Sequence, residues 1–91
     1  TKPLVFSGKN LAINFATSAA GGIKVQIESQ DGKPLEGYTF VDCQELIGNE
    51  IDRVVVWKGK SDLESLAGKP VRLRFQLKDA DVYALQFMKT P

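Results

Sequence analysis

The chain has 91 residues, of which 43% are apolar and 25% are charged, a composition typical of one soluble globular domain. Twelve basic and eleven acidic residues give a net charge of +1 with the signs interleaved, so the basic stripe that nucleic-acid binding requires is missing. No apolar run approaches the ~20 residues of a membrane span. The chain has no histidine, which excludes Ser-His-Asp and Cys-His catalysis and predicts that it is not an enzyme by itself.

The cysteine content and the N-terminus bear on where the chain comes from. Cys43 is the only cysteine, so no intrachain disulfide can form. This favours an intracellular location or an extracellular domain held by packing or metal. With no His to activate it, Cys43 is predicted to be a small buried residue. The sequence begins without Met and without a signal peptide, so we expect residues 1–91 to form a single domain excised or processed from something longer.

Apolar and polar residues alternate over two segments in the N-terminal part. After a short apolar run at residues 4–6, the period-two pattern of a half-buried strand covers residues 11–16 and returns at residues 23–28. Ala19-Ala20-Gly21-Gly22 breaks the pattern between them and predicts a connection. Asp31-Gly32-Lys33-Pro34 predicts a turn after the second strand, because Asp and Gly tolerate turn dihedrals and Pro stops the pairing.

The middle of the chain is less regular. Residues 38–41 form a short segment of β-prone residues, and the irregular pattern of residues 42–50 predicts a loop. The strongest apolar run, residues 51–57, predicts a strand that is covered on both faces or shifts face at a bulge. Ser61-Asp62-Leu63-Glu64 has the capping-box spacing and predicts one helical turn through Leu66.

Two further alternating segments complete the chain. Residues 71–78 and 83–88 both have period-two patterns, and the sequence at residues 78–81 predicts a turn between them. About seven short strands separated by turn signals predict two packed sheets or a closed barrel. We therefore expect an all-β fold, a single antiparallel β-sandwich of the jelly-roll-like kind with about seven to eight short strands.

Carboxylates gather in two places where calcium could bind. Asp79 and Asp81 lie two residues apart in the predicted turn, where they serve as turn formers, ligate calcium or act as an acid/base pair. A second acidic cluster flanks Cys43, and its members are Asp42, Glu45, Glu50 and Asp52. Its spacing does not fit an EF-hand, so the alternatives there are a solvated polar loop and a structural calcium site.

Aromatic residues would serve carbohydrate binding most directly, because their faces stack on sugar rings. Trp57, Tyr38 and Phe40 are not tied to a strand pattern and are the binding candidates. Trp57 precedes the polar Lys58-Gly59-Lys60 segment and could be an exposed platform, but a Trp beside three valines is also typical of a core residue. Four aromatics in phase with the apolar positions of their strands are predicted to lie in the core: Phe15, Phe75, Tyr83 and Phe87.

Much of the chain, from about Leu11 to Phe87, resembles a C-terminal β-sandwich accessory module of bacterial multidomain glycoside hydrolases of the β-propeller kind. The resemblance is carried by turns and by the Trp-Lys-Gly segment. Its segments are Gly22-Ile23-Lys24-Val25-Gln26-Ile27, Asp31-Gly32-Lys33-Pro34, Asp42-Cys43, Arg53-Val54-Val55-Val56-Trp57-Lys58-Gly59, Ser61-Asp62-Leu63, Ala67-Gly68-Lys69-Pro70-Val71-Arg72-Leu73-Arg74-Phe75 and Leu77-Lys78-Asp79-Ala80-Asp81.

The resemblance implies a jelly-roll-like accessory domain at the C-terminal end of a longer, secreted or periplasmic chain. In such proteins the catalytic carboxylates belong to the propeller, so the implied role is non-catalytic. Two functions follow from it. Either the domain binds carbohydrate, or it braces the neighbouring catalytic domain of the same chain and binds no small ligand. Fold resemblance alone does not decide between them.

Overall fold

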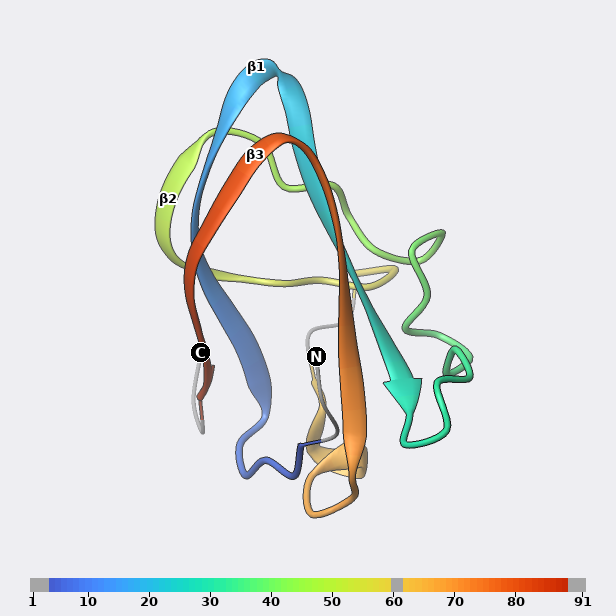
Figure 1. The fold of residues 1–91 in the computed structure, drawn as a ribbon. Coiled ribbons are helices and arrows are strands. Elements are labelled where there is room, and N and C mark those ends of the chain that lie inside the picture. The colour runs from blue at the N-terminus through green and yellow to red at the C-terminus, as the bar shows by residue number, and fades with distance from the viewer. Residues whose placement is uncertain (1–3, 60–61, 89–91) are drawn as a thin grey trace.

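A computed structural model of the chain describes residues 4–59 and 62–88. In this part of the chain, the elements in order are β1 (Asn10–Ser29), β2 (Asn49–Val54), the one-turn 3₁₀ helix η1 (Glu64–Leu66) and β3 (Val71–Met88). The strands form one antiparallel sheet in the order β2-β1-β3, with the long β1 in the middle (Figure 1). No helix in the described residues has the length and hydropathy needed to cross a membrane.

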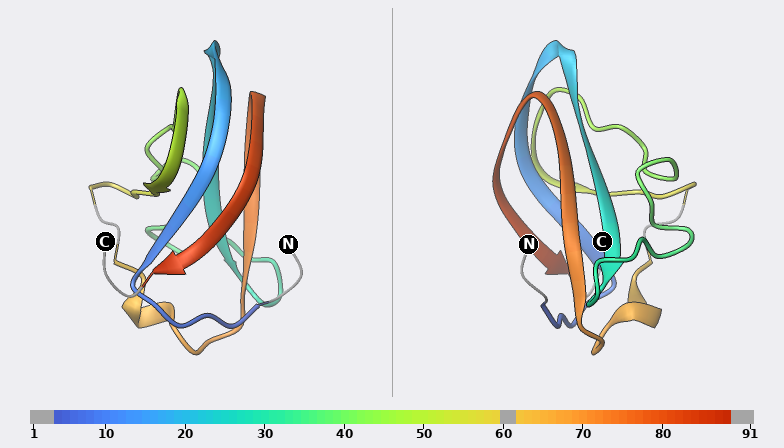
Figure 2. Two further views of the ribbon diagram at one scale, coloured as in Figure 1. Left: turned by 90° about the vertical axis from the view of Figure 1, so that its left-hand side faces the viewer. Right: turned by 45° about the vertical axis from the view of Figure 1, so that its right-hand side comes forward.

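The sheet folds back on itself because β1 and β3 bend at the same end of the molecule (Figure 1). Pairing of the two strands stops after Thr17 and Ala80 and resumes at Gly22 and Lys78, so the bend falls in residues 18–21 of β1. On β3 the bend contains Asp79, whose φ of 46° lies in the left-handed region. The bend divides the sheet into two layers that face each other (Figure 2). The first layer contains residues 10–17 of β1, β2 and residues 80–88 of β3, and the second layer contains residues 22–29 of β1 and residues 71–78 of β3.

The expected jelly-roll-like sandwich of seven to eight short strands is wrong, since the structure has a single three-stranded antiparallel sheet. Residues 11–16 and 23–28 are two halves of β1, and residues 71–78 and 83–88 are two halves of β3. The breaks in their patterns bend the strands without ending them. Small residues allow this: Gly21 lies so close to β3 that an added Cβ would be 2.4 Å from the Lys78 carbonyl oxygen.

Three smaller expectations have mixed outcomes. Residues 38–41 form a turn and no strand, because the Thr39 carbonyl accepts the backbone N–H groups of Asp42 and Cys43. The strand expected over residues 51–57 begins and ends earlier in the sequence, as β2 at Asn49–Val54. One helical turn is confirmed in η1, where the Asp62 carboxylate accepts the Glu64 backbone N–H; the expected cap, Ser61, lies outside the described residues.

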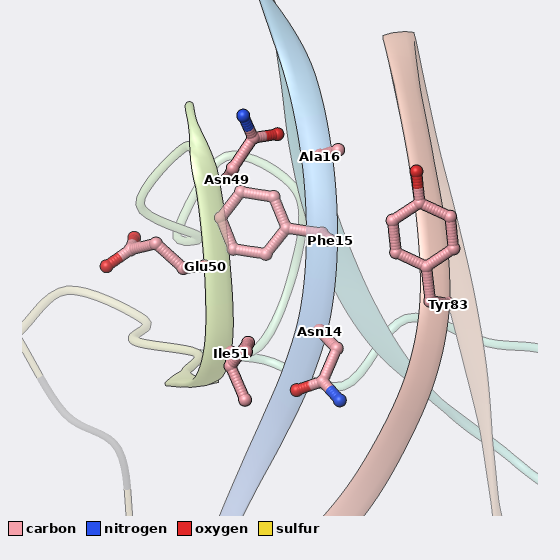
Figure 3. A pocket seen from close by; sticks show the side chains of 7 residues that line it. All are labelled: Asn14, Phe15, Ala16, Asn49, Glu50, Ile51 and Tyr83. Carbon is pink, nitrogen blue, oxygen red and sulfur yellow. The ribbon is translucent and has the colours of Figure 1, made fainter.

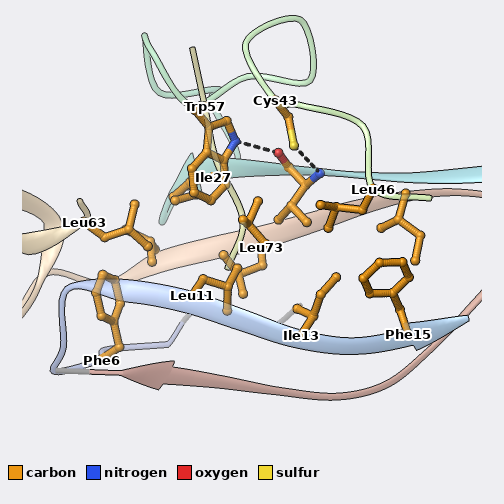
Figure 4. Close-up of a cluster of buried hydrophobic side chains, with 14 residues drawn as sticks. Phe6, Leu11, Ile13, Phe15, Ile27, Cys43, Leu46, Trp57, Leu63 and Leu73 are labelled. Atoms are coloured by element: carbon orange, nitrogen blue, oxygen red, sulfur yellow. Dashed lines mark hydrogen bonds between the residues drawn. The ribbon is translucent and has the colours of Figure 1, made fainter. Parts of the chain in front are cut away.

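The hydrophobic core fills the space between the two layers of the bent sheet (Figure 4). Alternate residues of β1 point into it from both sides of the bend, as the period-two pattern predicts. The apolar β1 residues that face the core are Leu11, Ile13, Phe15, Ile23, Val25 and Ile27. The loop after β1 covers the β1 edge of the second layer, where Ile27 donates its N–H to the Tyr38 carbonyl at 2.9 Å. The core also contains residues of β3 and of the segments outside the strands, namely Phe6, Cys43, Leu46, Val55, Trp57, Leu63, Val71 and Leu73.

On the β3 side the core is less completely covered. Leu77 and Leu85 pair with Ile23 and Ile13, which are fully buried, yet they are 48% and 38% exposed themselves. Phe75, expected in the core, is half-buried on the same strand, and Phe87 is half-buried and stacks on Phe6. The reason is positional, because β3 is an edge strand, whereas its neighbour β1 is flanked by β2 in one layer and by the loop after β1 in the other.

Candidate functional site

An open groove of about 700 Å³ crosses all three strands on the outer face of the first layer (Figure 3). Its place on the outer face follows from the pleat, because Asn14 and Ala16 alternate with the core residues Ile13 and Phe15. The residues that line it are Asn14, Phe15 and Ala16 of β1, Asn49, Glu50 and Ile51 of β2, and Tyr83 of β3.

A β-bulge directs Tyr83 to this groove. Asn14 pairs with Ala84 and Phe15 with Val82, which leaves Tyr83 as an extra residue on β3. A bulge locally changes the direction of a strand and of the side chains it carries. Tyr83 is consequently 70% exposed, and the expectation that it lies in the core is wrong, because the bulge shifts the inward and outward positions of the strand by one residue.

A second irregularity lies on the opposite side of Asn14, where β2 has one residue more than β1 between Ile13 and Phe15. There Asp52 has a φ of 54°, and the Asn14 side-chain oxygen accepts its backbone N–H at 2.6 Å. The Asp52 carboxylate in turn accepts a hydrogen bond from the side-chain amide of Gln86 on β3 at 3.0 Å. Polar side chains of all three strands are thus linked beside the groove.

The three aromatic residues proposed from the sequence lie elsewhere. Trp57 is 1% exposed, and its indole N–H donates to the Val25 carbonyl at 2.8 Å (Figure 4). An exposed sugar-stacking platform at Trp57 is inconsistent with this position in the core. Tyr38 contacts Trp57 edge-on with ring centroids 5.6 Å apart, and Phe40 is half-buried in the following turn. None of the three lines the groove.

The structure does not bring the four proposed metal ligands together. Asp42 lies in the turn after Phe40 and Glu45 packs beside Gly22, while Asp79 and Asp81 lie at and just after the bend of β3. Within residues 4–59 and 62–88, no group of three or more His, Cys, Asp or Glu side chains is arranged to hold a metal ion. The predicted turn at Asp79 and Asp81 is wrong as well, because both residues belong to the continuous strand β3.

The Asp42 carboxylate is occupied by structural contacts. It pairs with the Lys58 ammonium at 3.0 Å and accepts hydrogen bonds from the Thr39 hydroxyl and backbone N–H. These bonds lower the pKa of Asp42 below its ordinary value, and the bond from Lys58 has the largest effect. They therefore hold the turn at residues 39–42 to the segment that follows Trp57.

This pKa shift predicts a pH-dependent effect of Asp42→Asn. Because the folded protein has the lower pKa, the charged carboxylate stabilises it above the unfolded value of about 3.9, and this stabilisation disappears as the pH falls through the folded pKa. The variant should be less stable than the wild type at pH 7, and the gap should close in acid. Urea unfolding from pH 7 to pH 3 measures it. A gap that stays constant over this range would contradict the prediction.

Cys43 is confirmed as a buried residue. Its sulfur accepts the Val25 backbone N–H at 3.3 Å, and burial raises the pKa of the thiol. This favours the neutral thiol. The side chain helps to fix the centre of the second β1 half against the loop (Figure 4), and it does not line the groove.

Of the seven groove residues, only Glu50 was a sequence candidate, as a member of the acidic cluster considered for calcium. Asn14 gave a further local signal, as a polar residue in the middle of an apolar strand, and pattern reasoning assigned Tyr83 to the core. In comparisons with known proteins, no protein family, curated protein or solved structure matched the chain.

Proposed function

We propose that this chain is a non-catalytic, carbohydrate-binding accessory domain that uses the outer groove across β2, β1 and β3 as its glycan site. The observation that carries the proposal is the exposed Tyr83 ring, which lines the same groove as the side-chain amides of Asn14 and Asn49 (Figure 3). An aromatic ring offers a flat apolar face for the C–H face of a sugar, while amides both donate and accept hydrogen bonds and so match hydroxyl groups.

The open shape of the groove supports the same proposal. A site that crosses three strands and is open to solvent can accept an internal stretch of a polysaccharide. The proposal requires neither a catalytic residue nor a cofactor in this chain. In its parent protein, the domain would accompany a bacterial glycoside hydrolase of the β-propeller kind in a secreted or periplasmic location, which the sequence resemblance supports.

Tyr83→Ala tests this function. Removal of the ring is expected to weaken glycan binding at least about tenfold, which corresponds to roughly 1.4 kcal/mol. Because Tyr83 is exposed, stability should change little. Affinity electrophoresis of the folded domain in gels that contain soluble polysaccharides measures the binding.

Tyr83→Phe is the matched control, since it keeps the ring and should keep most of the affinity. Equal retardation of Tyr83→Ala and the wild type would contradict the assignment of the site. If no polysaccharide retards the wild type, the proposed function itself fails.

The second candidate function is that of a brace for a neighbouring catalytic domain. One specific observation favours it, namely the incomplete cover of the core along β3, where Leu77 and Leu85 remain partly exposed. A neighbouring domain packed on this side would bury them. This function becomes the better explanation if the glycan assay is negative throughout.

A further inference from the structure

We infer that the groove selects uncharged glycans and rejects acidic ones, such as those that contain uronic acids. This inference rests on the proposed function and adds the substrate class. It is carried by the charges that surround Tyr83 on the outer face of the sheet.

Three carboxylates lie on or beside the groove. Glu50 lines it directly, and Asp52 lines the small hollow next to it, which shares Asn14 with the groove. Asp81 pairs with Ala16, so its exposed side chain lies on the same outer face as the groove-lining Ala16. The three residues come from β2 and β3 and therefore stand on both sides of β1.

Little positive charge compensates them among the described residues. None of the seven lining residues is basic. The nearby Arg53 pairs with Glu50 and offsets its charge, so Asp52 and Asp81 carry the excess negative charge. Asp52 accepts from a neutral amide, that of Gln86. A uronate in the groove would meet an excess of like charge, while a neutral sugar would find hydrogen-bonding partners without this repulsion.

Asp81→Lys reverses one of these charges and tests the inference. The matched control is Asp31→Lys, which changes the net charge equally at an exposed turn on another part of the chain. Both variants and the wild type are run in native gels that contain a neutral galactomannan or β-glucan, an acidic polygalacturonate, or cationic chitosan. We expect the neutral polymers alone to retard the wild type, and Asp81→Lys to bind polygalacturonate at least about threefold more tightly than Asp31→Lys does.

The possible results separate the inference from the function on which it rests. Retardation of the wild type by polygalacturonate as strong as by the neutral polymers would overturn the inference and leave carbohydrate binding intact. Tighter binding of chitosan than of the neutral polymers would also overturn it, in favour of a cationic ligand. If polygalacturonate retards Asp81→Lys and Asp31→Lys equally, the charge at Asp81 has no local effect on binding, and the inference is overturned. Absence of all retardation would overturn the proposed function and the inference together.

Discussion

Trp57→Ala is expected to lower the free energy of unfolding by about 3–5 kcal/mol, the range for truncation of a large buried aromatic residue. The indole is almost fully buried between the two layers, touches Tyr38 and donates a hydrogen bond to the Val25 carbonyl. Its removal leaves a large cavity and an unpaired carbonyl. Since small domains are stable by about 5–15 kcal/mol in total, the variant should be close to unfolded at 37 °C.

Urea unfolding followed by far-UV circular dichroism measures this effect, because the variant lacks the only Trp of the chain. Trp57→Phe is the control that separates volume from hydrogen bonding. It keeps most of the buried ring but leaves the Val25 carbonyl without its donor, a cost of about 1–3 kcal/mol. A loss of less than 1 kcal/mol in Trp57→Ala would contradict the buried position of the indole.

Gly21→Ala is expected to destabilise the protein by about 3 kcal/mol, at the upper end of the cost of overpacking. An added Cβ would lie 2.4 Å from the Lys78 carbonyl oxygen and 2.7 Å from that of Asp79. Both atoms are backbone of β3 at its own bend. They cannot move aside unless the two bent strands separate, so the substitution acts on the bend that brings the layers together.

Gly22→Ala is the matched control at the next position. Its added Cβ would lie 2.4 Å from the Glu45 carboxylate, the end of a flexible and exposed side chain that can rotate away. We expect a loss of about 1 kcal/mol, the ordinary effect of a point substitution. Unfolding of the two variants in urea gives the comparison, and an equal loss in both would show that the close approach of Gly21 to β3 does not matter.

The sequence patterns identified the strands better than the connections between them. The alternation of Leu11, Ile13 and Phe15 predicted which side chains face the core, and all three are buried. The same reasoning took Ala19-Ala20-Gly21-Gly22 for the end of a strand. Small residues are compatible with a turn and with a close approach of two backbones, and only the partner strand distinguishes the two.

The candidate site was less predictable from the sequence than the core. A period-two pattern holds along a strand only where each of its residues pairs with one residue of the neighbouring strand. The bulge at Tyr83 interrupts this pairing, and no residue type in the sequence of β3 indicates that it is there. Carboxylates were sought as metal ligands because they are close in sequence. In the structure Asp42 is engaged by Lys58 and Thr39, and Asp79 and Asp81 lie in a continuous strand.

The sequence by itself determined that this is a small, all-β chain of nearly balanced charge, without histidine and with most of its inward-facing apolar residues recognisable. These properties depend on composition and on the local geometry of a strand, which each segment carries alone. The tertiary structure alone decided that four predicted strands are two bent ones, that Trp57 is in the core, and that Tyr83 faces an outer groove. Each of these depends on which backbone lies next to another, and so on contacts between residues that are distant in the chain.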